Sequence, residues 1–323
     1  MGIANAVNTS SNAAQAIKSR FYRETFLNRA KANLVHRQLG QLNVQVPAGQ
    51  GGYGTGVVYW TRFVNLPVVS AGQGEGVPTT AVQMTAVNVT GSTAQFDAAV
   101  SISDILKYAS FGDVMKQATD LLGYNAGVSI DTVVRDAISG NLTAQIGAGA
   151  ASITAIPATA TLSITELRKA KRTLERNDAM KPDGGFWVAV VHPDALYDLQ
   201  ADTTTGGWLT ANTYKDSADG LMTGESGKLM GIKFLETSLG KVLSTTSVVA
   251  TGSVYETQVL GKEAFGVTNL QDLEIIMHGF GSGGVSDPTN KIATAGWKTT
   301  FGAATLNPSF FLNLNHTVSS TAN

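Results

Sequence analysis

The sequence predicts an α+β protein with long extensions that leave its main body. Two segments, near 10–40 and 113–139, repeat apolar residues at helical spacing, whereas 57–64 and 81–89 alternate as strands do. Charged residues make up only 15% of the 323 residues, against roughly 25% in an average soluble domain. A chain so poor in charge is expected to cover much of its surface with partners.

The first forty residues predict a basic, amphipathic helix. Ser10 or Ser11 can cap it, and Gly40 suits the residue after its end. Its apolar stripe needs a surface to dock on, and it consists of Ile17, Phe21, Leu27, Ala30 and Leu34. Six basic residues face one acid, Glu24, so this arm carries +5 and the remainder −6. The arm is either a solvated helix face or a contact for polyanions or an acidic neighbour.

Residues 57–97 predict a long two-stranded β excursion. VVYWTRFV and AVQMTAVNV are joined by the polar connector SAGQGEGVPTT. Isolated two-stranded hairpins are at best marginally stable in water, so one of this length needs a surface to lie on. No lysine occurs from Ala32 to Leu106.

The second half predicts alternating helices and strands. Ser163 and Glu166 form a capping box at the start of the charged helix ELRKAKRTLERND. A buried strand over 186–191 ends at His192-Pro193, where a short helix begins, so we assign His192 a structural role. Further strands are expected over 227–237, 246–257 and from 271 onward.

No catalytic, cofactor-binding or metal-binding residues are predicted, and no cofactor. The chain has no cysteine, which excludes disulfides and thiolate zinc sites, and its four histidines lack metal-ligand spacing. Gly49-x-Gly51-x-x-Gly54 has the spacing of a dinucleotide loop, but a strand rather than a helix follows it. No stretch approaches the roughly 20 apolar residues of a membrane helix, so no membrane association is expected.

The order of segments resembles the major capsid proteins of tailed bacteriophages. The residues that carry the resemblance are VVHPDALYDLQAD at 190–202, GKLMGIKFLET at 227–237, VYETQVLGKEAFGV at 254–267 and GWKTTFGAATLNPSF at 296–310. The resemblance covers most of the chain, and its N-terminal half matches by architecture more than by motif.

The resemblance implies four parts of the tailed-phage capsid fold. Residues 1–46 would be an N-terminal arm, and 47–98 an extended β loop that lies across a neighbouring subunit. Residues 99–145 and 276–323 would form the peripheral domain, with 113–139 as its long spine helix. Residues 146–275 would form the axial domain. The glycines of 49–56 would then supply flexible turns at the base of the extended loop.

The resemblance also implies a function. The chain would be a structural protein, not an enzyme, and would assemble as hexamers and pentamers into an icosahedral virion shell around double-stranded DNA. Assembly would take place in the host bacterial cytoplasm. A separate scaffolding protein and a portal are the implied partners, and a decoration protein remains open. Without a lysine on the extended loop, the covalent crosslink of some family members is not expected.

Two sets of candidate contact residues follow. The candidate assembly contacts are Trp60, Arg62, Glu75, Trp208 and Tyr214. The candidate contacts to DNA or scaffold are Lys18, Arg20, Arg23, Arg29, Lys31 and Arg37. Two alternatives stay open: a nanocompartment shell protein of the same fold, and a nucleotide-binding enzyme that uses the glycine loops.

Overall fold

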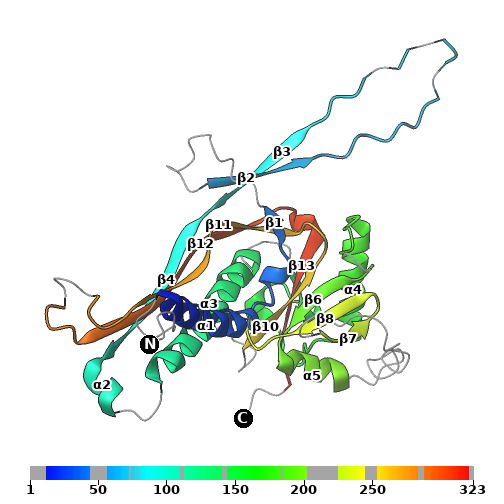
Figure 1. Ribbon diagram of the computed structural model, residues 1–323. Coiled ribbons are helices and arrows are strands. Elements are labelled where there is room, and N and C mark those ends of the chain that lie inside the picture. The colour runs from blue at the N-terminus through cyan, green and yellow to red at the C-terminus, as the bar shows by residue number, and fades with distance from the viewer. Residues whose placement is uncertain are drawn as a thin grey trace.

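The chain folds into a two-sheet body from which one hairpin projects (Figure 1). The computed structural model describes residues 12–43, 57–72, 74–76, 78–79, 81–109, 113–139, 144–182, 185–201, 225–243, 253–282 and 287–319. The α-helices of this part are α1 Asn12–Lys31, α2 Asp104–Ala109, α3 Val114–Ser139, α4 Ile164–Arg176 and α5 Pro193–Ala201. Short 3-10 turns lie at Arg37–Leu39, Gly147–Gly149, Ile153–Ala155 and Pro308–Phe310.

The larger sheet has seven strands and follows the order β5-β13-β10-β6-β8-β7, with β9 also paired to β10. Its strands are β5 Ala144–Ile146, β6 Trp187–Val191, β7 Glu225–Leu229, β8 Ile232–Glu236, β9 Lys241–Leu243, β10 Val254–Leu260 and β13 Phe311–His316. Helices α4 and α5 contribute Leu167, Leu174 and Leu199 to the apolar core on one face of this sheet. All five residues of β6 are buried, as expected for a strand that is covered on both faces.

The smaller sheet has four strands in the order β1-β11-β12-β4. They are β1 Gln41–Asn43, β4 Ala94–Ser103, β11 Phe265–His278 and β12 Ile292–Thr305. Strands β11 and β12 are 14 residues each and pair antiparallel, with register shifts between Asn269 and Glu274. This register change increases the local twist of the pair.

Helix α3 connects the two sheets. Leu122 and Ala126 in its first half pack against Trp297 of the four-stranded sheet. Ile130 and Val134 in its second half pack in a core that includes residues of the seven-stranded sheet. One helix of 26 residues therefore holds both sheets in a fixed relation, as the predicted spine helix requires.

Helix α1 lies on α3 of its own chain, so the body of the same chain supplies a surface for the arm, although Phe21 of the expected stripe stays 48% exposed. Phe26 is 0% exposed and Ala30 is 1% exposed. A Cβ on Gly123 would lie 2.7 Å from the Phe26 carbonyl oxygen, and one on Gly127 would lie 2.6 Å from that of Ala30. The two glycines let the helix backbones approach closely, a contact that the apolar stripe alone did not predict.

The predicted excursion projects as a hairpin of β2 Val57–Phe63 and β3 Ala86–Ser92 (Figure 1). The two strands pair antiparallel without a register shift, from Val57 opposite Ser92 to Phe63 opposite Ala86. Within the described residues, they pair with no other strand. Residue 94 then begins β4, so the hairpin continues directly into the four-stranded sheet.

Strand pairing places two expected domain limits differently. The limit between 275 and 276 falls inside β11, which pairs with β12 on both sides of it. Strand β13, expected in the peripheral part, pairs with β10 of the seven-stranded sheet. The tail therefore returns to the larger sheet, a long-range pairing that local sequence patterns do not specify. None of the helices in the described ranges is long and apolar enough to cross a membrane.

Candidate assembly surfaces

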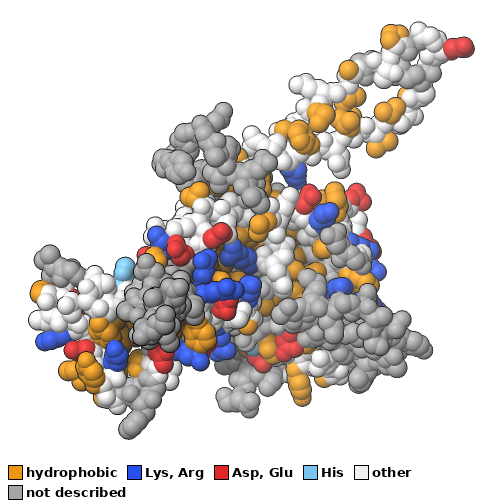
Figure 2. All heavy atoms as spheres, in the orientation of Figure 1, with side chains coloured by type: hydrophobic (Ala, Val, Ile, Leu, Met, Phe, Trp, Pro, Cys, Tyr) orange, Lys and Arg blue, Asp and Glu red, His pale blue; other side chains and the backbone are white. Residues whose placement is uncertain are grey.

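The hairpin carries many exposed apolar side chains, and among them is Val68, the most exposed large apolar residue of the described part of the chain. Val68 is 91% exposed and Val69 is 78% exposed, although valine is among the residue types most often buried. The other exposed apolar residues of the hairpin are Tyr59, Phe63, Val64, Leu66, Val82, Met84 and Val87. Figure 2 shows hydrophobic side chains along both limbs of the projecting hairpin. Large exposed apolar patches mark interaction sites.

The two charged candidates on the hairpin are both exposed. Arg62 lies in β2, and Glu75 lies at the tip, where Figure 2 shows a single acidic side chain. Neither has an ion-pair partner among the residues that the structure describes. Both charges are therefore available to a partner that meets the hairpin.

Trp60, the third candidate on the hairpin, anchors the base of the hairpin within its own chain. It is 7% exposed and packs in a small core with Val58 and Leu306. A Cβ on Gly91 would lie 2.6 Å from the Trp60 ring, and one on Gly266 would lie 2.7 Å from its Nε1. These glycines make room for the indole, so Trp60 fixes the hairpin to the body rather than presenting itself to a partner.

The cations of the arm divide into engaged and free groups. Arg29 lies 3.8 Å from Asp120 of α3 and over the Tyr124 ring, and the Arg37 guanidinium donates a 2.7 Å hydrogen bond to Asn269. Burial lowers the pKa of Arg37, against the opposing charge of Asp272.

Three other candidate cations of the arm lie on the exposed face of α1. Arg20 pairs with Glu24, and both side chains are well exposed. Arg23 and Lys31 are exposed and have no ion-pair partner in the described part of the chain. Of the described candidates on the arm, these two are the ones free to meet a polyanion.

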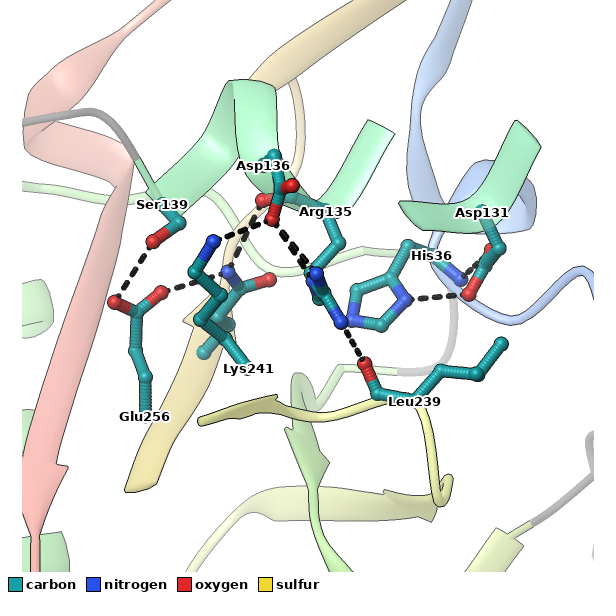
Figure 3. A network of polar contacts seen from close by, with 9 residues as sticks. His36, Asp131, Arg135, Asp136, Ser139, Leu239, Lys241 and Glu256 are labelled. Carbon is teal, nitrogen blue, oxygen red and sulfur yellow. Dashed lines mark hydrogen bonds and ion pairs between the residues drawn. The ribbon is translucent and has the colours of Figure 1, made fainter. Parts of the chain in front are cut away.

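A buried acid-histidine pair fixes the end of the arm. The His36 Nδ1 and Asp131 Oδ2 atoms are 2.7 Å apart, and both side chains are at most 1% exposed. The other carboxylate oxygen of Asp131 accepts from the backbone N–H groups of His36 and Arg37. Figure 3 shows how this carboxylate, which projects from α3, reaches the arm. Removing one partner of such a buried pair is strongly destabilising, so it locks the arm onto the spine helix.

A second polar network joins the end of α3 to the seven-stranded sheet (Figure 3). The Arg135 guanidinium donates to the Leu239 carbonyl at 2.7 Å, and Lys241 donates to Asp136 at 2.7 Å. Burial raises the pKa of Asp136, but hydrogen bonds from Lys241 and Arg135 outweigh it and hold that pKa below its usual range.

Glu256 forms the buried end of this network. Ser139 donates to its carboxylate at 3.0 Å. Burial raises the pKa of Glu256, opposed by hydrogen bonds from Gln258 and Ser139 and by the charges of Lys241 and Arg135. Its partners tie α3 to the larger sheet through polar contacts that sequence spacing does not reveal.

The remaining candidates cannot be placed. Trp208 and Tyr214 and the glycine loop 49–56 lie outside the described residues, and the side chain of Lys18 is also outside them. The spacing Gly-x-Gly-x-x-Gly occurs a second time at 279–284, and its first two glycines, Gly279 and Gly281, follow β11.

The described histidines take part in structural contacts. The His192 ring accepts from the Asp194 backbone N–H at 3.3 Å, which fits its expected structural role. Burial lowers the pKa of His316 to about 4, and its Nε2 lies 2.9 Å from the Thr257 hydroxyl. Within the described ranges, no three His, Cys, Asp or Glu side chains gather where they could hold a metal ion.

The fold matches solved phage capsid structures. No protein-family model matches the sequence, and no curated protein matches it. The capsid of Ralstonia phage GP4 is similar over 88% of both chains, with a TM-score of 0.72 and 12% identity. The capsid of cyanophage Pam1 is similar over 83% of this chain and 86% of its own, with a TM-score of 0.63 and 14% identity.

A third similar structure extends the comparison. The capsid of cyanophage P-SCSP1u covers 89% of both chains with a TM-score of 0.61 and 16% identity. At these identities the similarity lies in the arrangement of helices and sheets rather than in shared motifs. The chain therefore has the α+β fold of phage capsid proteins.

Proposed function

We propose that this chain is the major capsid protein of a tailed bacteriophage. In this proposal it assembles as pentamers and hexamers into an icosahedral shell that encloses double-stranded DNA. The observation that carries the proposal is the projecting hairpin, whose apolar residues include Val68 at 91% exposure and whose strands pair with no other strand among the described residues. The fold shared with the capsids of Ralstonia phage GP4 and the cyanophages supports it.

A closed lattice of copies gives the hairpin the surface it lacks. Two-stranded hairpins are marginal in water, and obligate subunit contacts bury roughly 2,000–5,000 Å² with core-like packing. A heterologous contact, in which each copy offers a hairpin and receives another, closes into a ring when the rotation closes. The low charge content of the chain is also suited to large buried contacts.

The DNA side of the proposal rests on the arm. Arg23 and Lys31 lie on the exposed face of α1 without acidic partners in the described residues. Exposed cations of this kind make sequence-independent phosphate contacts. A separate scaffolding protein and a portal are the expected partners, and the mature protein would be a virion component.

The test is electron microscopy of the purified protein, expressed alone and together with its neighbouring genes. We expect closed shells of uniform diameter in at least one of these preparations. A double variant, Val68→Asp with Val69→Asp, is expected to lower the shell yield at least about tenfold, since it places two charges in the apolar contact. Its matched control is Ser70→Asp, which adds a charge on the same limb but removes no apolar side chain.

The outcomes separate the functions. Shells filled with nucleic acid of phage-genome size favour the capsid, whereas small shells that hold an enzyme favour the nanocompartment. A protein that stays monomeric in every preparation, and binds nucleotide, would contradict both shell functions. Unfolding of each unassembled variant by denaturant checks that the body is unchanged.

A further inference from the structure

A groove of about 1060 Å³ runs along strand β2 at the base of the hairpin. Its first wall is continuous, because every residue from 58 to 65 lines it. Successive side chains of a strand point to opposite faces, so a wall built from consecutive residues is the strand's edge rather than one face. Its second wall includes Asp178 and Met180 after α4, Glu263 between β10 and β11, and Phe310 of the 3-10 turn that follows β12.

The pairing of the hairpin shows which backbone groups point away from β3. The Val64 N–H donates to the Thr85 carbonyl at 2.9 Å, so residue 64 belongs to a hydrogen-bonded pair. In an antiparallel ladder such pairs alternate with non-hydrogen-bonded ones. With the uninterrupted register of β2 and β3, Thr61 and Phe63 fall in the non-hydrogen-bonded pairs. Their N–H and C=O groups therefore point away from β3.

Those groups form an unpaired strand edge. In the described part of the chain, β2 pairs with no strand but β3, and the backbone groups of Thr61 and Phe63 have no hydrogen-bond partner there. An open edge of this kind is a template for another extended chain. Main-chain hydrogen bonds then give affinity, and pockets for alternate side chains give specificity.

The side chains around the groove fit a peptide strand. Leu42 is 57% exposed and Met180 is 52% exposed, so the walls offer apolar contacts beside the edge. Arg62, Asp178 and Glu263 add charges of both signs to the walls. An incoming strand would meet both apolar and charged side chains, and its successive side chains would point to opposite faces.

We propose that an extended segment of a second copy of this chain enters the groove and pairs with β2 as a third strand. This inference rests on the proposed shell function. Exposed apolar side chains continue from the groove into the limb, at Phe63 and Val64 in the groove and Leu66 beyond it. A copy that covers the limb therefore reaches the groove as well. Pairing in the shell also protects an edge that would otherwise promote aggregation.

The first test removes one hydrogen-bond donor from the edge. Thr61→Pro deletes the outward N–H, which β3 does not use, and proline is tolerated on edge strands where its nitrogen faces outward. The expected result is a loss of shell yield of about fivefold or more, from the loss of one contact repeated in every subunit. Denaturant unfolding of the unassembled subunit should be unchanged.

The matched control is Thr61→Val. The Thr61 hydroxyl donates to Asn88 on β3 at 3.0 Å, and valine removes this bond but keeps the backbone N–H. We expect Thr61→Val to assemble like the natural sequence. Equal yields for Thr61→Pro and the natural sequence would overturn the inference, as would equal losses in both variants.

The second test identifies the occupant. A photo-crosslinking phenylalanine analogue at Phe63, in shells mixed from isotopically light and heavy subunits, should give peptides that join one copy to another. Crosslinks confined to one copy, or to a different protein, would overturn the inference. If shells form and Thr61→Pro leaves them unchanged, the shell function stands and this pairing fails. If the natural sequence forms no shell in any preparation, both fail.

Discussion

The two extensions of this chain, the arm and the hairpin, differ in whether their apolar side chains are buried against the body. The arm helix α1 buries Phe26 and Ala30 on α3 of its own chain, at 0% and 1% exposure. The hairpin leaves comparable side chains in solvent, with Phe63 at 61% exposure. Two similar sequence signals, an apolar stripe and an alternating strand pair, thus have opposite structural outcomes. An apolar extension identifies an interface only after the surfaces of its own chain have been considered.

The partner surface explains the difference. Helix α3 has glycines at 123 and 127, and at these positions the backbones of α1 and α3 approach each other closely. The buried pair of His36 and Asp131 then fixes the end of the arm. Within the described residues, the hairpin is anchored at its base through Trp60, and its strands pair with no other strand. In the proposed shell, a neighbouring copy would supply the surface that its limbs lack.

The largest expected effect comes from a matched pair of truncations, Phe26→Ala and Phe63→Ala. Phe26→Ala should lower the free energy of unfolding of the isolated subunit by about 3–5 kcal/mol, because it opens a cavity between α1 and α3. Phe63→Ala should change that free energy by less than about 0.5 kcal/mol, because the side chain is exposed. Urea denaturation followed by circular dichroism measures both values.

The effects of the two variants on shell yield should have the opposite order, when equal amounts of soluble, folded protein are compared. Phe63→Ala should reduce the shell yield although the subunit is stable, since the lost surface is buried only between copies. A large loss of subunit stability in Phe63→Ala would mean that the hairpin docks on its own chain in solution. That result would remove the contrast between the two extensions.

A smaller effect is expected from a second pair, Gly127→Ala and Gly72→Ala. The new Cβ at 127 would lie 2.6 Å from the Ala30 carbonyl oxygen, whereas nothing lies within 4 Å of one at 72. Overpacking costs about 1–3 kcal/mol, offset in part by the roughly 1 kcal/mol better helix propensity of alanine. Gly127→Ala should therefore loosen α1, measured as faster proteolysis after its basic residues. Equal rates of α1 proteolysis in the two variants would argue against the close contact between α1 and α3.

The smallest effect concerns the charges of the arm. Replacing Arg23 and Lys31 by glutamine should make the slope of the log binding constant for DNA against the log salt concentration less negative by about 2. The reason is that two phosphate contacts are lost. Replacing Arg29 and Arg37 by glutamine should change the slope less, since both already contact groups of their own chain. Fluorescence anisotropy across a salt series measures the slopes. Equal changes in the two double variants would mean that the arm leaves α3 when it binds DNA.

Local patterns in the sequence predicted many elements of the fold. The helix expected over 113–139 forms at Val114–Ser139. Ser163 accepts from the Glu166 backbone N–H, which is one half of the expected capping box, whereas the Glu166 carboxylate accepts from Gln145 and Lys169. The excursion forms as a hairpin because alternating β-branched and aromatic residues need no distant information. The α+β fold of phage capsid proteins is likewise confirmed by the solved structures.

Distant contacts account for what the sequence did not predict. The positive charge of the first forty residues suggested free cations, yet Asp120 of α3 faces Arg29. The buried contact of Asp131 with His36 joins residues 95 positions apart, which no local pattern encodes. Trp60 looked like a surface aromatic because the glycines that accommodate it, Gly91 and Gly266, lie far away in the chain. The spacing of Gly123 and Gly127 was the one signal available for the docking of α1.

The packing of Trp60 fixes the base of the projecting ribbon. Its ring lies against Gly91 and Gly266, and this contact holds the base of the ribbon at one angle to the body. The last ladder bond to β3 is made by Val64, and among the described residues that follow it no strand begins before residue 86. The contacts that hold the ribbon therefore lie in its inner half. In the proposed shell, the outer half would be the part that adapts to different curvatures between neighbouring copies.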